Sequence, residues 1–134
     1  MVWHIWGEGV PIVFLHGGHG DWSHWCRNVE QIAAEGFKVI VADLPGLGAS
    51  DDPGPPYTAE GIAEIVYYGI TSLLPENSEI DLVGFSFGSV IGAVVAEKLD
   101  IRLKSFTVVG AAGFGPRERI CLLYTSPSPR DRPL

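Results

Sequence analysis

The sequence predicts an α/β fold in which a mainly parallel β-sheet is flanked by helices. Four short apolar runs are bounded by glycine, proline or charged residues, which is typical of strands buried on both faces. Three longer segments with helical patterns alternate with these runs, and the alternation implies parallel strands joined by right-handed crossovers. The expected strands span residues 10–15, 38–42, 80–84 and 105–110, and the expected helices span residues 22–34, 58–74 and 87–99.

The composition agrees with a single folded domain. The chain has 134 residues, of which 46% are hydrophobic and 19% are charged. This balance is typical of a core-forming protein, and the length suits one domain. The net charge is −7 and the basic residues do not cluster, which argues against nucleic acid and anionic membranes as partners. The longest apolar run, residues 90–96, is far too short to span a membrane.

The first buried strand ends in a glycine-rich loop. Residues 4–9 predict the end of an earlier strand and a turn, after which residues 10–15 lead into His-Gly-Gly-His-Gly at residues 16–20. A glycine-rich turn after a buried strand leaves backbone N–H groups that can point at a developing negative charge, as acyl transfer requires. The first expected helix, residues 22–34, follows this loop.

The second strand, residues 38–42, leads into Asp-Leu-Pro-Gly-Leu-Gly-Ala-Ser at residues 43–50. The proline-rich turn at residues 51–56 cannot be helical and separates this loop from the helix that begins near Thr58. The loop and the turn therefore connect the second strand to the second helix.

The third strand ends in Gly-Phe-Ser-Phe-Gly at residues 84–88, the most informative pattern of the chain. A serine on a sharp strand-to-helix turn has its hydroxyl held above the sheet, where a base and a substrate can reach it. Side chains at Gly84 or Gly88 would crowd the neighbouring backbone in so tight a turn. The pattern therefore predicts Ser86 as a nucleophile, whereas the structural alternative is a serine that caps the following helix.

The helix after this turn is expected to lie inside the fold. Its apolar residues, from Val90 to Ala96, leave no polar face before Glu97. Gly92 and Ala93 would let the helix approach the strands closely. The last expected strand, residues 105–110, completes the alternating pattern.

The three loop motifs, in this order and spacing, resemble the α/β-hydrolase fold family over about residues 10–115. The resemblance implies that the strands lie side by side in the order second, first, third, fourth, in a partial sheet that ends before the family's last strands and its lid. It implies that Ser86 forms an acyl-enzyme and that the backbone N–H groups of Gly18 and Phe87 form the oxyanion hole. Asp43 and His16 would then hold the loops through backbone hydrogen bonds.

The aromatic residues near the motifs are candidates for an apolar substrate wall: Trp22, Trp25, Phe85 and Phe87. We expect Phe85, Trp22 and His19 to contact substrate, although an exposed loop position explains His19 nearly as well. Helix packing is the better interpretation of Trp25. No cofactor and no metal are expected. The candidate metal ligands are His16, His19, Asp21 and His24, but their glycine-rich setting suits an oxyanion turn better. The interpretation of residues 17–20 as a phosphate-binding loop fails, because no Gly-Lys-Ser/Thr sequence follows them.

The remaining members of a catalytic triad are not found after Ser86. The family places them in the order Ser, Asp/Glu, His, yet no histidine follows Ser86 in this chain. We therefore expect the acid and the histidine to lie beyond residue 120, so that this chain is an inactive piece of an enzyme. Residues 121–134 resemble a translated sequencing adapter. We accordingly expect an incomplete hydrolase core at residues 1–120 and an artefactual, disordered tail at residues 121–134.

The function expected for the parent protein is hydrolysis of small apolar carboxylic esters or lactones. Two alternatives stay open: carbon–carbon bond hydrolysis on the same fold, which Phe85 disfavours because related C–C hydrolases often carry asparagine there, and a non-catalytic binding protein. Apart from Cys121 in the suspect tail, Cys26 is the only cysteine. A disulfide framework is then impossible, which agrees with a cytoplasmic location. The sequence leaves the oligomeric state open.

Overall fold

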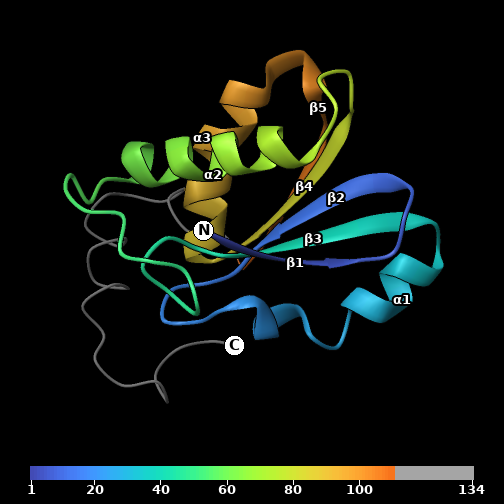
Figure 1. Cartoon of the computed structure of the whole chain (residues 1–134), viewed down its shortest axis with the longest axis horizontal. Coiled ribbons are helices and arrows are strands. Elements are labelled where there is room, and N and C mark those ends of the chain that lie inside the picture. Colours follow the sequence, from blue (N-terminus) through green and yellow to red (C-terminus); the bar gives the residue numbers. More distant parts are fainter. Residues whose placement is uncertain (111–134) are drawn as a thin grey trace.

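The computed structural model describes residues 1–110, which form a five-stranded sheet with helices on both faces (Figure 1). The strand order is β1-β3-β2-β4-β5, with β1 antiparallel to β3 and every other pair parallel. The strands are β1 (Val2–Trp6), β2 (Val10–Leu15), β3 (Phe37–Asp43), β4 (Ile80–Phe85) and β5 (Leu103–Val109). The predicted α/β class and the predicted order of the four parallel strands are both confirmed.

The strand before residue 7 is longer than the sequence suggested and lies at one edge of the sheet that residues 1–110 form. It does not pair with β2, its neighbour in sequence. Instead Val2 lies opposite Asp43 and Trp6 opposite Val39 on β3. The N-terminal strand therefore reaches the loop that follows β3, where it can contribute side chains to that end of the sheet.

The helices form two layers. Figure 1 shows α2 and α3 on one face of the sheet and α1 with the short helix η1 on the other. The helical segments are η1 (Trp22–Trp25), α1 (Val29–Ala34), α2 (Ala59–Leu73), α3 (Phe87–Leu99) and η2 (Asp100–Arg102). The second and third expected helices are confirmed within a residue at each end.

The single helix expected at residues 22–34 is wrong, because the chain forms two helical pieces there. The N–H of Cys26 bonds to the carbonyl of Ser23 and that of Asn28 to the carbonyl of Trp25, each three residues back. This is the tighter 3₁₀ pattern. The α-helical pattern begins only with the bond from the N–H of Ile32 to the carbonyl of Asn28.

The central strands are buried on both faces, as predicted. Side chains alternate between the two faces of a strand, so the same strands supply two separate hydrophobic clusters. Val13, Leu15 and Ile40 pack with α2 and α3, while Phe14, Val39 and Val41 pack with η1 and α1. The core is therefore divided by the sheet into two layers.

Strand β5 departs from the expectation of burial on both faces. Phe106 packs against the cluster under α3, but Lys104, Ser105 and Thr107 are exposed. The strand lies at the edge of the sheet over the residues that the structure describes. On the face opposite Phe106, residues 105, 107 and 109 are all exposed, so residues 1–110 leave most of that face uncovered.

Helix α3 is buried along one side only, which corrects part of the sequence interpretation. Ile91, Val95 and Leu99 are buried at a spacing of four residues, and Gly92 lies against the ring of Phe106. Ala93 is exposed and does not contribute to the close approach. The predicted boundary at residue 120 and the predicted tail at residues 121–134 lie outside the described residues.

Candidate active site

The loops that carry the two glycine motifs begin side by side. Strands β2 and β4 are parallel neighbours, and Leu15 at the end of β2 pairs in register with Gly84 on β4. The loop at residues 16–20 and the turn at residues 84–88 therefore both follow the carboxyl ends of adjacent strands. In open α/β sheets, functional loops gather at the carboxyl ends of the parallel strands.

Ser86 is the single residue that connects β4 to α3. Its backbone has φ 52° and ψ −115°, a conformation that serine seldom adopts. Its N–H donates to the carbonyl of Val109 at 3.0 Å, and its carbonyl accepts the N–H of Ser89 at 2.9 Å and the hydroxyl of Ser89 at 2.5 Å. The surrounding hydrogen bonds thus hold a conformation that costs about 1–3 kcal/mol. The Ser86 side chain makes no capping bond to α3, so the helix-cap alternative lacks its hydrogen bond.

The glycines of this turn are required by contact with backbone atoms. A Cβ atom at Gly84 would lie 2.7 Å from the carbonyl oxygen of Gly88, and one at Gly88 would meet the carbonyl oxygens of Leu15 and His16. Backbone atoms at those positions cannot turn aside as a flexible side chain could. The expected crowding at both glycines is confirmed.

His16 holds the loop after β2 in place, as expected. The ring is fully buried. Its Nδ1 lies 2.7 Å from the carbonyl oxygen of Gly17, and its Nε2 accepts the N–H of Leu44 at 2.9 Å. This pair of bonds assigns the proton to Nδ1. Burial lowers the pKa of His16 below its ordinary value, so the ring is held neutral.

Gly18 and Phe87 lie next to each other, although 69 positions separate them in the sequence. A Cβ atom at Gly18 would be 3.7 Å from the Cβ of Phe87. The structure therefore brings the two residues predicted to supply oxyanion donors to one place, beside the turn that carries Ser86.

Asp43, the last residue of β3, links β1, η1 and the loop that follows β3. Its carboxylate accepts the N–H of Trp22 at 2.9 Å and that of Ala49 at 3.1 Å, and lies 3.1 Å from Nε2 of His4. Burial disfavours the charged form, but these N–H groups and His4 outweigh it and hold the pKa of Asp43 below its ordinary value. The predicted role of Asp43 in holding backbone N–H groups is confirmed.

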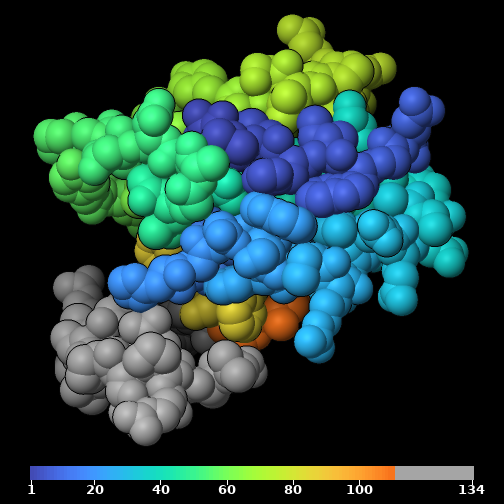
Figure 2. All heavy atoms as spheres, turned by 60° about the horizontal axis from the view of Figure 1, so that its bottom comes forward, coloured from blue at the N-terminus to red at the C-terminus, as the bar shows by residue number. Residues whose placement is uncertain are grey.

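His4 was missed by the sequence interpretation. His4 lies opposite Val41 on β3 through the antiparallel pairing of β1, and no local sequence pattern predicts that pairing. Figure 2 shows the segment after β2 and the loop after β3 meeting on one face of the molecule, close to the N-terminal strand. Ser50 strengthens this junction, because its hydroxyl donates to the carbonyl of Asp43 and accepts the N–H of Val2.

The aromatic residues expected to form one substrate wall have different ring neighbours. The Phe85 ring lies against Gly17 and contacts the rings of His24 and Trp25, with centroid distances of 5.6 and 6.4 Å. The Trp22 ring instead lies 5.1 Å from His4 and 5.4 Å from the Trp6 ring, near the β1 edge. Phe85 and Trp22 therefore belong to different groups of aromatic rings, and their contact with a substrate stays a prediction.

Trp25 is buried in the layer under the sheet, where its ring lies 4.8 Å from that of Phe14, so its predicted packing role is confirmed. His19 is exposed and has a φ of +58°. His24, which the sequence interpretation considered only as a metal ligand, accepts the N–H of Gly17 at its Nδ1 at 3.1 Å. Within residues 1–110, no three His, Cys, Asp or Glu side chains are grouped so that they could hold a metal ion.

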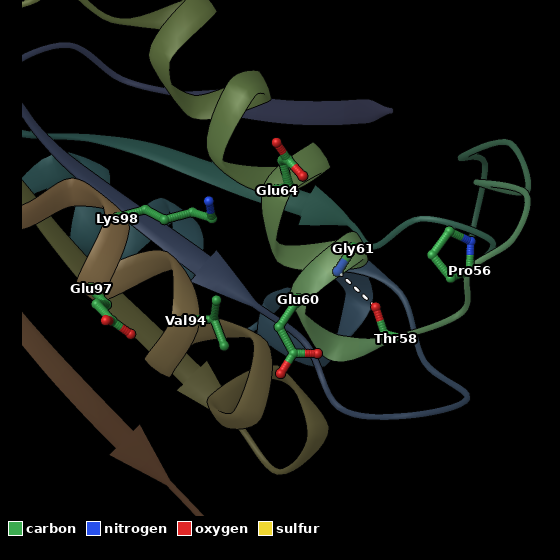
Figure 3. A pocket seen from close by; sticks show the side chains of 8 residues that line it. All are labelled: Pro56, Thr58, Glu60, Gly61, Glu64, Val94, Glu97 and Lys98. Carbon is green, nitrogen blue, oxygen red and sulfur yellow. Dashed lines mark hydrogen bonds between the residues drawn. The ribbon is translucent and has the colours of Figure 1, made fainter.

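A surface groove of about 630 Å³ lies elsewhere, between α2 and α3 (Figure 3). It is lined by Pro56, Thr58, Glu60, Gly61, Glu64, Val94, Glu97 and Lys98. The lining comes from the start of α2 and the second half of α3, whereas Ser86 precedes the first turn of α3. None of the predicted site residues contributes to the groove, so it is a separate feature.

Comparison with known proteins identifies the fold. A sequence profile for the alpha/beta hydrolase fold matches residues 10–128. The chain belongs to the α/β-hydrolase fold family. This α/β-hydrolase chain contains, in its described part, no helix long and apolar enough to cross a membrane.

Two bacterial relatives and one solved structure illustrate the likeness. The chain is 33% identical over 110 residues to a dihydrolipoyllysine-residue acetyltransferase component of an acetoin cleaving system from Pseudomonas putida, covering 81% of this chain and 29% of the relative. It is 33% identical over 112 residues to a 2-hydroxy-6-oxo-2,4-heptadienoate hydrolase from a strain of P. putida, covering 80% and 39%.

The solved structure is an epoxide hydrolase from Vigna radiata, with a TM-score of 0.75 at 23% identity over 98% of this chain and 39% of that one. At this identity the likeness concerns the fold alone. The α/β-hydrolase chain spans well under half the length of each of these three proteins.

Proposed function

We propose that this chain carries the nucleophile and the oxyanion hole of a serine hydrolase that acts on small apolar carboxylic esters or lactones. The observation that carries the proposal is the backbone of Ser86, held at φ 52° between a buried strand and a helix. Strained conformations of this kind persist where the surroundings over-determine them, and they cluster at functional sites. Membership in a hydrolase-fold family supports the same conclusion.

In the proposed reaction, Oγ of Ser86 attacks the carbonyl carbon of the ester while a base takes its proton. Negative charge develops on the carbonyl oxygen, where the N–H groups of Gly18 and Phe87 would stabilise it. Collapse of this intermediate expels the alcohol, which takes a proton from the protonated base, and leaves an acyl group on Ser86. Water then attacks the acyl group, releases the acid and restores the serine. Removing one oxyanion donor typically costs about 10²–10³ in rate.

The base and its orienting acid are assigned outside this chain. His16 is unsuited to act as the base, because both of its ring nitrogens are engaged with backbone groups. No histidine follows Ser86, although the family's order places the base after the nucleophile. Ser86, Gly18 and Phe87 are accordingly one part of a site that the longer protein completes.

The ring of Phe85 and the side chain of His19 are proposed to contact substrate beside Gly18. Phe85 lies against the glycine loop and closes one side of it. We keep Trp22 only as a more distant contact, since its ring packs on His4 and Trp6. A cytoplasmic location is part of the proposal, because Cys26 and Cys121 are the only cysteines and a disulfide framework is not expected.

A second candidate is hydrolysis of a carbon–carbon bond. It is favoured by the 33% identity to the 2-hydroxy-6-oxo-2,4-heptadienoate hydrolase over 80% of this chain. The two candidates differ in the leaving group, an alcohol in one and a carbon fragment in the other. Turnover of a short-chain nitrophenyl ester and of a 2-hydroxy-6-oxo-dienoate by the longer protein would distinguish them.

The nucleophile itself is tested by labelling. The longer protein is treated with a fluorophosphonate, which esterifies activated serines, and the adduct is located by mass spectrometry of its peptides. We expect one adduct on Ser86, lost in Ser86→Ala and kept in Ser72→Ala, where the serine only bonds to the carbonyl of Gly69 on α2. An adduct that persists in Ser86→Ala would refute the assignment, and an unlabelled wild type would favour the non-catalytic alternative.

A further inference from the structure

His24 reaches back from η1 to the glycine loop and contacts it in several places. Its Nδ1 accepts the N–H of Gly17 at 3.1 Å, and its ring stands edge-on to that of Phe85 at 5.6 Å. A side chain at Gly20 would collide with the imidazole, and the ring of His16 lies 5.8 Å away. The ring therefore fills the space between the loop and the strand that carries the nucleophile turn.

Gly17 is thereby held on both of its peptide units. The carbonyl of Gly17 bonds to Nδ1 of His16, and its N–H bonds to Nδ1 of His24. Because a peptide unit is planar and trans, the carbonyl of Gly17 and the N–H of Gly18 lie in one plane and point in opposite directions. Fixing the carbonyl of Gly17 therefore fixes the direction of the Gly18 N–H.

The bond from His24 is needed because Gly17 is a glycine. Without a side chain its backbone can rotate more freely than that of any other residue. The His16 bond orients the peptide unit after Gly17, while the His24 bond orients the unit before it. Together the two imidazoles restrict both backbone dihedrals of Gly17.

We infer that His24 is a positioning residue, whose neutral Nδ1 holds the Gly17–Gly18 segment in the orientation needed by the oxyanion hole and releases it when the ring is protonated. A neutral imidazole has one donor and one acceptor nitrogen, whereas an imidazolium has two donors. Protonated Nδ1 would place an N–H against the N–H of Gly17. The inference rests on the proposed function, because it assumes that Gly18 serves as an oxyanion donor.

The charged and titratable groups around His24 come from three directions. His16 at the end of β2 is buried, and burial keeps its pKa below the ordinary value. Asp21, which caps η1, accepts the N–H and the hydroxyl of Ser23. Asp43 at the end of β3 is bonded to Trp22, Ala49 and His4, and β4 presents the uncharged ring of Phe85. Among residues 1–110, neither carboxylate therefore makes a hydrogen bond to the ring of His24.

The test follows the loop by nuclear magnetic resonance on the full chain labelled with ¹⁵N. The ring nitrogens of His24 and the amides of Gly17 and Gly18 are recorded between pH 8 and pH 5. We expect the two amides to shift with the same midpoint as the His24 ring. In His24→Phe that transition should disappear, and exchange of the Gly17 amide with solvent should be at least about tenfold faster.

Two further variants separate positioning from general damage. His24→Asn supplies a carbonyl acceptor that does not titrate, so the Gly17 amide should stay protected without a pH-dependent step. His19→Asn removes a neighbouring, exposed imidazole and introduces a residue that tolerates a φ of +58°, so it should leave the transition unchanged. Circular dichroism of each variant checks that the sheet and helices are intact.

The inference is overturned if Gly17 in a folded His24→Phe chain keeps its protection, or if its amide follows the ring of His16 and not that of His24. These measurements require no turnover. A failure of fluorophosphonate to label Ser86 would therefore count against the proposed function while the coupling of His24 to Gly17 is judged separately.

Discussion

The first turn of α3 rests on the end of β2, because Gly88 lies directly against the carbonyl oxygen of His16. A Cβ atom at Gly88 would be 2.5 Å from that oxygen and would also collide with the carbonyl of Leu15. This contact sets the spacing between the turn that carries Ser86 and the loop that carries Gly18. The two glycine motifs are thus coupled by backbone packing as well as by the neighbouring strands.

Substituting Gly88 should therefore damage the fold more than a comparable change nearby. We expect Gly88→Ala to lower the free energy of unfolding by about 1–3 kcal/mol or more, because backbone atoms must move to admit the methyl group. Gly18→Ala is the matched control, since its Cβ would make an ordinary 3.7 Å contact with Phe87. Urea denaturation of both variants checks this, and equal losses would contradict it.

The parallel strands were predictable because each is a short apolar run between turn residues. The loop motifs that follow them mark where each strand ends. The pairing of β1 with β3 was not predictable, since Val2 and Asp43 are far apart in sequence and no sequence pattern in β1 indicates which strand it pairs with. The break after Trp25 was missed because 3₁₀ and α-helical segments share nearly the same apolar spacing.

The site was predictable where glycine is demanded by geometry. The glycines at residues 16–20 and 84–88 make both loops recognisable in the sequence. The neighbouring positions of Gly18 and Phe87 follow from the strand order. The contributions of His4 and His24 were not predictable, because both depend on where a ring reaches after folding. The contact of the Trp22 ring with His4 and Trp6 was not predictable for the same reason.

The backbone of Ser86 should store measurable strain. Asp100 has nearly the same dihedrals, φ 50° and ψ −117°, far from the site. Relief of about 1–3 kcal/mol of strain should exceed the entropic cost of a glycine, about 0.5–1 kcal/mol. We therefore expect Ser86→Gly and Asp100→Gly each to raise the free energy of unfolding by about 1 kcal/mol, whereas Ser86→Ala should not. Stabilisation at Asp100 alone in thermal unfolding would show that Ser86 is unstrained.

His16 should make stability depend on pH just below neutrality. Its pKa is lowered by burial, so below pH 6.5 the unfolded chain binds a proton that the folded chain does not. Stability from this source is complete above pH 6.5 and declines as the pH falls towards the folded pKa, by up to about 1.4 kcal/mol per pH unit. Urea denaturation of His16→Phe should show a shallower decline over this interval.

That variant should also be less stable at pH 7, because the N–H of Leu44 and the carbonyl of Gly17 lose their partner. Each unsatisfied buried group costs about 1–3 kcal/mol. The exposed His19 is the control, and His19→Gln should leave both the stability and its pH dependence nearly unchanged. An unaltered pH dependence in His16→Phe would assign the decline to other groups.

Asp43 should control stability in a lower pH range. Its pKa is lowered in the folded state, despite burial, by the N–H groups of Ala49 and Trp22 and by His4. The stabilisation is therefore present above the ordinary value of 3.8 and is lost as the pH falls below it through the folded pKa. Asp43→Asn should cost about 2 kcal/mol at pH 7, because an uncharged amide is a weaker acceptor and its NH₂ group cannot accept an N–H. Asp51→Asn is the control, since the Asp51 side chain is exposed. Denaturation at pH 7 and pH 3 should show the deficit of Asp43→Asn shrinking with acid, and a constant deficit would mean that the charge of Asp43 does not hold these loops together.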